Sequence, residues 1–431
     1  MFVGLSFLAT SIVLRTLDAA SVGAYWFCIA AAKIVTGCIS DSLDLVVLRS
    51  VPKNIIGDRP KALDTLRASF WLRLLAVGLI GVAVALFPRP LSEAAFKRPD
   101  YTYLLWLTTS ALVGEMLIRS VMGYFQSCFA FNRLILLDII VQSTRFLGVA
   151  ALLATGTLSL PTALGAYLLA PFMAFFVAVF LLPSDLRLPR PASLGEFLAV
   201  FRFSQWVMAG MALAAIYERL DVILLGLLRG PAEVGVYAPA VMLASMPELV
   251  VSVVLTVVNP RVAALYEEGR FNELVSGYLR YSIPIGACAI TGAVLLGGPV
   301  ITTLFGSKYS NSIGLFKILA VGTLCFYIVT PVYSALLSIL APRRVLLATS
   351  LAVSAVTLGG FLAIPLFGAT GAAAVLTGVR ILMSALIVFL AQGVLRRAPS
   401  PAAAAVGVAA ILSQLRFRAP ISSAWAVWSG Y

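Results

Sequence analysis

The sequence predicts an all-α integral membrane protein with twelve transmembrane helices in two pseudo-symmetric six-helix bundles. Three observations lead to this prediction: a strongly apolar composition, apolar runs long enough to cross a bilayer, and a second half that repeats the first. Of the 431 residues, 61% are hydrophobic and 11% are charged, and the mean hydropathy is +1.02. Soluble domains carry roughly 25% charged residues. The bilayer is therefore the solvent that suits this chain.

Composition also excludes several classes of function. The net charge is +13, but the basic residues lie in short gaps between apolar runs, so we expect no nucleic-acid partner. Histidine is absent, which excludes a histidine metal site or a histidine general base. The five cysteines lie in apolar runs and form no CxxC pair, so we interpret them as buried small hydrophobes. We expect no metal site and no cofactor.

The apolar runs define the predicted spans. A helix needs about 20 apolar residues to cross the hydrocarbon core. The twelve runs cover residues 1–16, 22–48, 69–88, 101–129, 134–158, 162–182, 200–228, 234–258, 279–304, 313–340, 345–367 and 369–395. In the tail, the aromatic residues Trp425, Trp428 and Tyr431 favour the membrane surface over a further crossing.

The gaps between the runs predict the orientation. One side of the membrane receives 18 Lys and Arg residues and the other receives 6. The basic side should be cytoplasmic. An even number of spans then places both termini in the cytoplasm.

A proline-rich stretch divides the chain. Residues 182–195 read LPSDLRLPRPASLG, a composition that excludes a buried helix. We therefore predict an N-terminal bundle over residues 1–182, a cytoplasmic linker over 183–199, a C-terminal bundle over 200–395 and a cytoplasmic tail over 396–431.

The two predicted bundles align without a gap at one constant offset. Val22-Gly-Ala-Tyr25 aligns with Val234-Gly-Val-Tyr237. The same offset pairs Ala20 with Ala232, Arg49 with Arg261, Gly57 with Gly269, Gly148 with Gly360, and Gly156 with Gly368. Six spans per half predict parallel repeats about a central cleft, the architecture of alternating access. The first span is shorter than its counterpart, so we expect a truncated first helix or a misassigned start.

Charged residues within the spans are the candidate functional residues. They are Lys33, Asp41, Asp44, Arg73, Glu115, Arg119, Asp138, Arg145, Glu218, Arg219, Asp221, Glu248, Lys317 and Arg380. Each costs roughly 2.5–3.5 kcal/mol at the centre of a helix on insertion scales, so they must pair, snorkel or line a hydrated passage. Helix spacing suggests the pairs Glu115–Arg119 and Asp138–Arg145. Arg73 lies near the end of its predicted span, and we expect it to snorkel.

Two roles are open for these residues. Arginine suits a diphosphate because its planar fork donates two hydrogen bonds; ion pairs that only hold the bundle together are the structural alternative. The predicted substrate-binding set is Arg219, Asp221, Lys33, Lys317, Arg380, Arg119, Arg145 and Glu115. The predicted coupling-ion residues are Asp41, Asp44 and Asp221. No spacing indicates which ion they would bind.

Several ordered motifs resemble those of a known family. They are Arg15-Thr-Leu-Asp-Ala-Ala-Ser-Val-Gly-Ala-Tyr25, Asp221-Val-Ile-Leu-Leu-Gly226, Glu233-Val-Gly-Val-Tyr237, Asn259-Pro260, Leu265-Tyr-Glu-Glu-Gly-Arg270, Leu304-Phe-Gly-Ser-Lys-Tyr309 and Ile364-Pro-Leu-Phe-Gly-Ala-Thr-Gly-Ala-Ala373. In order and spacing the chain resembles polysaccharide transporters and O-antigen flippases, within the multidrug/oligosaccharidyl-lipid/polysaccharide exporter superfamily. That resemblance implies a MATE-like fold in a bacterial inner membrane.

The resemblance further implies a flippase that exports a polyprenyl-diphosphate-linked oligosaccharide for O-antigen, lipopolysaccharide, capsule or exopolysaccharide assembly. Its partners would be the lipid-linked oligosaccharide, the bilayer, and a polysaccharide polymerase with glycosyltransferases. A cation-coupled multidrug or metabolite antiporter of the same fold is the alternative. An enzyme is disfavoured because the sequence shows no nucleophile constellation and no phosphate-cradling glycine motif.

Overall fold

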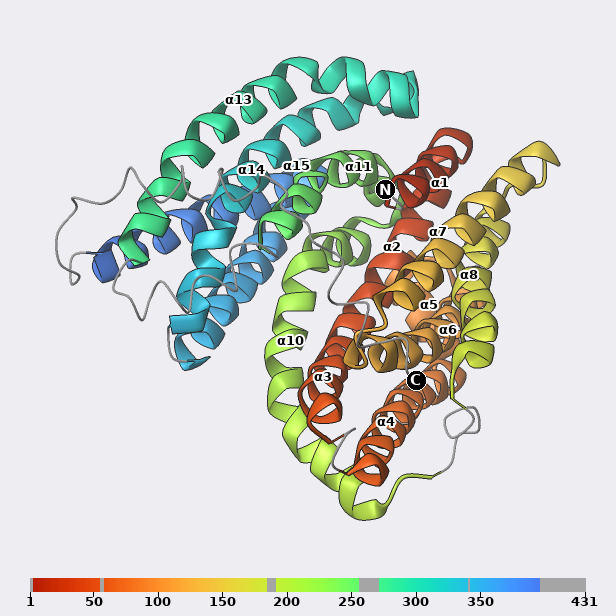
Figure 1. Ribbon diagram of the computed structural model, residues 1–431. Coiled ribbons are helices and arrows are strands. Elements are labelled where there is room, and N and C mark those ends of the chain that lie inside the picture. Colours follow the sequence, from red (N-terminus) through yellow and green to blue (C-terminus); the bar gives the residue numbers. More distant parts are fainter. Residues whose placement is uncertain (1–2, 55–57, 184–190, 256–270, 340–341, 396–431) are drawn as a thin grey trace. The chain divides into compact units, whose positions relative to one another are not determined.

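The computed structural model describes residues 3–54, 58–183, 191–255, 271–339 and 342–395, and these residues contain helices and no strand (Figure 1). The predicted all-α fold is confirmed. Two of the motifs that carry the resemblance, Asn259-Pro260 and Leu265–Arg270, lie outside the described residues, as do the middle of the predicted linker and the tail.

The first half begins with α1 (Val3–Thr16) and α2 (Ala19–Thr36). A π-helix, η1 (Gly37–Asp41), continues α2 into α3 (Ser42–Asn54). The remaining elements of this half are α4 (Arg59–Leu86), α5 (Pro88–Phe96), the 3₁₀ turn η2 (Pro99–Tyr101), α6 (Thr102–Ser127), α7 (Phe131–Ala154) and α8 (Leu160–Leu181).

The second half begins with the long helix α10 (Leu194–Arg229) and α11 (Pro231–Ala244), followed by a helix over Pro247–Leu255. Its later elements are α13 (Phe271–Phe305), the 3₁₀ turn η3 (Ser307–Tyr309), α14 (Ser310–Ile339) and α15 (Pro342–Leu395). Within α15, Gly368 has φ 56° and ψ −136°, which separates two helices. This break falls between the predicted spans 345–367 and 369–395.

The described helices include eight that are long and apolar enough to cross a membrane, or nine if one bent pair forms a single span. The bent pair is Pro231–Ala244 with Pro247–Leu255. The short α1 contributes an apolar helix, Gly4–Thr16, that is below the length of a full crossing. The protein is therefore a multi-pass membrane protein, while the count of twelve spans stays a prediction.

The chain forms two compact units. Unit 1 comprises Met1–Ser245, Ala293–Gly322 and Arg343–Val379. Unit 2 comprises Met246–Gly292, Thr323–Pro342 and Arg380–Tyr431. The predicted division at the linker into two six-helix bundles stays a prediction.

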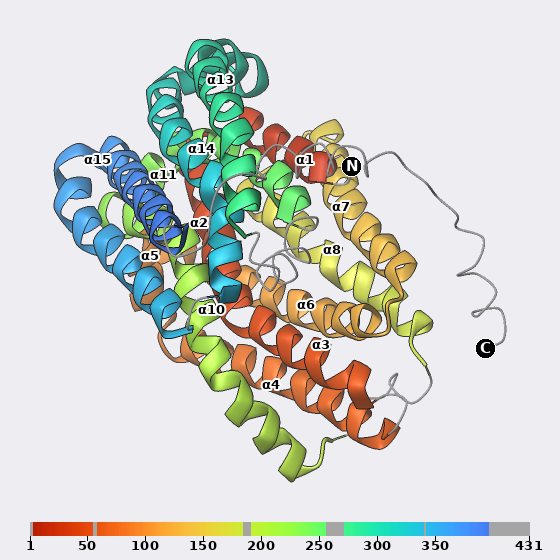
Figure 2. The same ribbon diagram turned by 60° about the vertical axis from the view of Figure 1, so that its left-hand side comes forward.

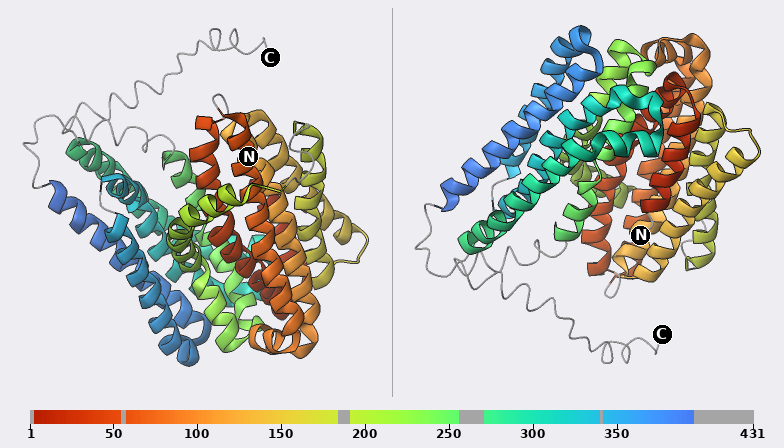
Figure 3. Two further views of the ribbon diagram at one scale, coloured as in Figure 1. Left: turned by 90° about the horizontal axis from the view of Figure 1, so that it is seen from below. Right: turned by 90° about the horizontal axis from the view of Figure 1, so that it is seen from above.

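Within unit 1, α4, α6, α7 and α8 run alongside one another, and α6 also packs on α2 and α3 (Figures 2 and 3). Buried Leu43, Leu72 and Met116 form part of a core that joins α3, α4 and α6. Helix starts carry capping residues: the Asp18 carboxylate accepts hydrogen bonds at the start of α2, and Ser159 and Thr162 form a capping box at the start of α8. The packing of these helices therefore determines which neighbouring helix each charged side chain faces.

The constant offset of the sequence repeat recurs in the backbone. Helices α2 and α11 begin at Ala19 and Pro231, which are separated by the same offset as Val22 and Val234. Gly156 and Gly368, another pair that the repeat aligns, both have positive φ, 68° and 56°. At both of these equivalent positions, a glycine with positive φ lies where a helix ends or breaks.

Candidate functional site: the charged cluster inside the first half

Helices α3, α4 and α6 pack together (Figure 1). Four of the embedded charged residues, carried by these helices and by η1, form ion pairs with one another. The Nη2 atom of Arg73 lies 2.5 Å from Oδ1 of Asp44. Arg119 Nη1 lies 3.5 Å from Oδ2 of the same Asp44 and 3.4 Å from Oδ1 of Asp41. We call Asp41, Asp44, Arg73 and Arg119 the aspartate–arginine cluster.

The π-helix η1 places the two aspartates. Asp41 is its last residue, and Asp44 lies in the first turn of α3. Gly37 begins η1, and a Cβ there would lie 2.6 Å from the Cβ of Ala215 on α10. A larger side chain could not fit where these two segments touch. π-helical turns occur often at functional sites because the extra residue redirects neighbouring side chains.

Arg73 is the most buried member of the cluster. It is 1% exposed, and its guanidinium donates to the Ser69 hydroxyl at 2.9 Å and to the Ser120 hydroxyl at 3.3 Å, besides Asp44. The prediction that Arg73 snorkels to the headgroups is wrong. Helix α4 begins at Arg59, ten residues before the predicted span, which moves Arg73 from near the end of the helix to its middle.

A second ion pair lies nearby on α6 and α7. Arg145 Nη2 donates to Oε1 of Glu115 at 2.6 Å, and the Arg145 guanidinium carbon lies 4.1 Å from the ring centre of Tyr167 on α8. Arg145 is 9% exposed. The hydrogen-bonded carboxylate and the aromatic face together compensate a buried guanidinium.

The observed pairs differ from those that spacing along single helices suggested. Arg145 pairs with Glu115, not with Asp138, and Asp138 accepts a hydrogen bond from Gln142. Arg119 forms its ion pairs with Asp41 and Asp44, although its charge also acts on Glu115. The ion pairs form between different helices because tertiary packing brings those side chains closer together than the spacing along one helix does.

Lys33 belongs, with the aspartate–arginine cluster and the Glu115–Arg145 pair, to the charged set of the first half. It lies in the last turn of α2, is exposed, and acts electrostatically on Glu115. Within the described part of the chain, no ion pair involves its ammonium group. Four cations, Lys33, Arg73, Arg119 and Arg145, thus share three carboxylates, Asp41, Asp44 and Glu115. The charged set of the first half therefore contains more cations than carboxylates.

The candidate residues of the second half form no such cluster among the described residues. Asp221 is 3% exposed and accepts a 2.7 Å hydrogen bond from the hydroxyl of Tyr237. Arg219 is half-buried, and Lys317 is exposed. In unit 2, Arg380 donates to the Thr323 hydroxyl. The structure therefore brings together Lys33, Asp41, Asp44, Glu115, Arg119 and Arg145 of the predicted residues.

Three partners of these arginines were not predicted from the sequence: Ser69, Ser120 and Tyr167. Ser69 lies one helical turn before Arg73, so an i,i+4 search would have found it. Ser120 and Tyr167 carry no comparable signal, because they reach their arginines from other helices.

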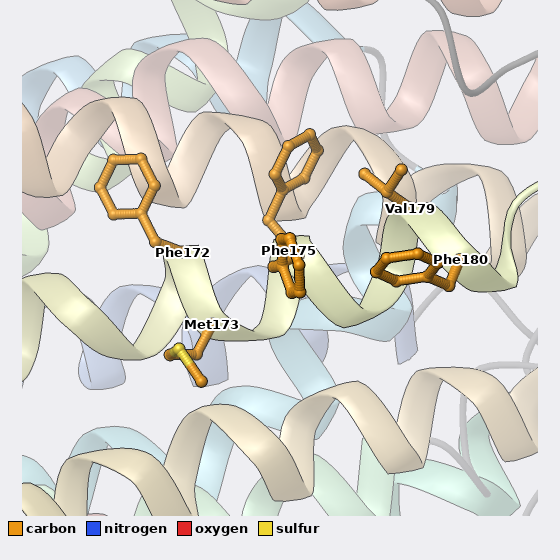
Figure 4. A pocket seen from close by; sticks show the side chains of 6 residues that line it. Phe172, Met173, Phe175, Val179 and Phe180 are labelled. Carbon is orange, nitrogen blue, oxygen red and sulfur yellow. The ribbon is translucent and has the colours of Figure 1, made fainter.

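A groove of about 380 Å³ on α8 has a different character (Figure 4). It is lined by Phe172, Met173, Phe175, Phe176, Val179 and Phe180. Every lining side chain is apolar, and Phe176 and Phe180 are 65% and 63% exposed. Such a surface suits lipid chains and offers nothing to hold a charged group.

Several solved structures of membrane transporters resemble this fold. The Lipid II flippase MurJ in an inward closed conformation matches with a TM-score of 0.73 at 14% identity, over 91% of this chain and 87% of that one. An inward-facing multidrug resistance MATE family transporter of the MOP superfamily matches with a TM-score of 0.69 at 14% identity, over 90% and 93%. A MOP superfamily transporter from Pyrococcus furiosus matches with a TM-score of 0.64 at 15% identity, over 91% and 92%. The chain therefore has the fold that these MATE and MurJ structures share.

The model of the polysaccharide biosynthesis protein family matches residues 1–265, and the chain belongs to that family. No curated protein matches the sequence. The fold and the family agree with the resemblance found in the sequence motifs.

Proposed function

We propose that the protein is a flippase that moves a polyprenyl-diphosphate-linked oligosaccharide across the bacterial inner membrane for cell-surface polysaccharide assembly. Family membership and the MATE-like fold support transport, and one of the similar structures is a lipid II flippase. Both termini would be cytoplasmic, and a polysaccharide polymerase and glycosyltransferases would be partners. O-antigen, lipopolysaccharide, capsule or exopolysaccharide is the class of product.

The observation that carries this proposal is the positive excess in the charged set of the first half. Arg73 and Arg145 are buried and held by carboxylates, so they are poor candidates for direct contact with a substrate. Lys33 is exposed, and the Arg119 side chain is 34% exposed. These two cations are the ones that would meet a diphosphate, because phosphate oxygens accept charge-assisted hydrogen bonds from exposed donors.

The proposed mechanism uses the buried ion pairs for support and the more exposed cations for binding. Buried pairs hold Arg119 and Glu115 in place, which lowers the cost of ordering them when the headgroup enters. The diphosphate binds at Lys33 and Arg119, the polyprenyl tail stays in lipid, and the two halves rock about the headgroup. Arg219, Lys317 and Arg380, whose side chains are half-buried or exposed, would line the second half of the passage.

A direct test measures translocation of a fluorescent polyprenyl-diphosphate-linked oligosaccharide in proteoliposomes. Lys33→Met should reduce the rate because it removes the surplus charge, and Lys33→Arg should retain most of it. Arg89→Met, at an exposed position outside the set, is the matched control. A wild-type rate no higher than that of empty liposomes would defeat the proposal.

An antiporter for drugs or metabolites is the second candidate, and Asp221 favours it. This carboxylate is buried, and within the described residues its hydrogen-bond partner is the neutral Tyr237 hydroxyl. A group of this kind could take up a coupling proton or cation, whereas arginines already occupy Asp41 and Asp44. The antiporter predicts drug efflux that depends on an ion gradient and is lost in Asp221→Asn.

A further inference from the structure

Helices α2 and α11, which belong to opposite halves of the chain, touch backbone to backbone within unit 1. A Cβ built on Gly23 of α2 would lie 1.6 Å from the carbonyl oxygen of Pro231 in α11. A Cβ built on Gly235 of α11 would lie 1.8 Å from the carbonyl oxygen of Ala19 in α2. Real Cβ atoms never approach oxygen so closely, so only glycine permits this contact.

The contact is reciprocal under the internal repeat. The offset that aligns Val22 with Val234 also aligns Gly23 with Gly235 and Ala19 with Pro231. Each glycine therefore rests on the first carbonyl of the other helix. The repeat exchanges the Gly23–Pro231 contact with the Gly235–Ala19 contact. Such an exchange defines a local pseudo-two-fold axis between α2 and α11, as in an isologous interface. Such an axis is where two rocking halves would meet.

Polar contacts close the same end of the protein. Lys308 of η3 donates from Nζ to the carbonyl oxygens of Arg15 and Leu17 at 3.0 and 2.6 Å. The hydroxyl of Tyr309 donates to the carbonyl of Leu14 at 2.9 Å. These bonds cap the end of α1 in the first half with donors from the second half. They are made only while the two halves stay together at this end.

We infer that the Gly23–Gly235 contact is the external gate of the transport pathway, closed in this structure and latched by Lys308 and Tyr309. The inference rests on the proposed transport function, and the charge-based orientation places residues 16–19 outside. Opening to the outside requires α2 and α11 to separate. A methyl group at either glycine would therefore penalise the closed state and leave the open state unaffected.

The test follows gate opening without any substrate. In the full chain with its five cysteines replaced by serine, Ala30→Cys supplies the reporter. Ala30 is 2% exposed and lies two helical turns below Gly23 on the same face of α2. A membrane-impermeant maleimide is added to either side of oriented proteoliposomes, and the labelling rate of this cysteine is measured.

Gly23→Ala and Gly235→Ala should each raise labelling from the outside by roughly tenfold, the size expected for an overpacked contact. Gly78→Ala is the control, since a Cβ at Gly78 meets no atom within 4 Å. Should a glycine variant fail to fold, Lys308→Met removes the latch at an exposed position and should raise the same labelling by a smaller factor.

Unchanged labelling in the folded variants, or an increase from the cytoplasmic side alone, would overturn the gate. Because no substrate is present, this result is independent of the translocation assay. A gate that opens as expected in a protein that moves no lipid-linked oligosaccharide would leave the inference standing and defeat the proposed flippase.

Discussion

Arg73 and Asp44 form a 2.5 Å ion pair between α4 and α3, with the arginine almost entirely removed from solvent. The half-buried Arg119 contacts the other oxygen of the same Asp44. Removing one partner of such a buried pair strongly destabilises a protein, whereas replacing both partners with apolar residues is often nearly neutral. Its role is to hold a charge in place, and this can be measured.

We expect Arg73→Met to destabilise the protein by about 3–5 kcal/mol, because Asp44 loses its nearest cation. Asp44→Leu added to Arg73→Met should recover much of the loss, since no uncompensated carboxylate remains. Thermal unfolding in detergent checks both. Arg89→Met, at an exposed position, should stay within about 0.5 kcal/mol of the parent. Additive losses in the double variant would contradict the pairing.

The Arg145–Glu115 pair should tolerate lysine poorly. Lysine keeps the charge of Arg145 but loses the flat surface that lies 4.1 Å from the ring centre of Tyr167. We expect Arg145→Lys to lower the unfolding midpoint and Tyr167→Leu to lower it in a non-additive way, with a coupling of about 0.5–2 kcal/mol. Independent effects of the two substitutions would show that the stacking contributes nothing.

Repeat-equivalent tyrosines provide a matched pair of variants. Tyr237 donates to the buried Asp221 carboxylate, and its equivalent is the buried Tyr25. Tyr237→Phe should cost about 1–3 kcal/mol because it leaves a buried carboxylate oxygen without its donor. We expect Tyr25→Phe to cost less, since no carboxylate of the described residues accepts a hydrogen bond from it. Equal losses, measured by unfolding in detergent, would argue against a special Tyr237–Asp221 bond.

Gly368 should resist substitution. Its φ of 56° with ψ of −136° is a conformation that suits glycine, and a Cβ there would lie 3.0 Å from Oε2 of Glu233. Gly368→Ala should destabilise by about 1–3 kcal/mol. Gly378→Ala, later in α15 and with no atom within 4 Å of its Cβ, should be neutral or stabilising by up to about 1 kcal/mol. The difference between the two unfolding midpoints is the measurement.

Asp18 should give stability a dependence on pH. The Ser21 side chain and the backbone amides at the start of α2 hold the pKa of the Asp18 carboxyl below its usual range. The folded pKa is lower than the unfolded pKa, so the stabilisation is present above the unfolded value and is lost as pH falls through the folded value. Asp18→Ala should cost about 0.5–2 kcal/mol at neutral pH and less in acid. A cost that does not change between neutral and acidic pH would exclude this role.

Local patterns predicted much of the architecture. Apolar runs placed the helices, because a backbone in lipid must satisfy its own hydrogen bonds. The break between spans 345–367 and 369–395 fell at Gly368, where the structure bends. The ordered motifs indicated the family that the comparisons confirm. Charged residues within the runs marked Asp41, Asp44, Glu115, Arg119 and Arg145, since charge in a membrane span must have a reason.

Sequence alone thus determined which residues form apolar helices, that the halves repeat, and which charges need partners. The tertiary structure decided who those partners are. The prediction placed Arg73 near the end of its helix because α4 begins ten residues before the apolar run. It paired Arg145 with Asp138 because helical periodicity identifies neighbours only along the same helix, whereas the observed partner Glu115 lies on another helix. Ion pairs and the Gly23–Gly235 contact depend on the distance between different helices, which is set by packing and leaves no period in the chain.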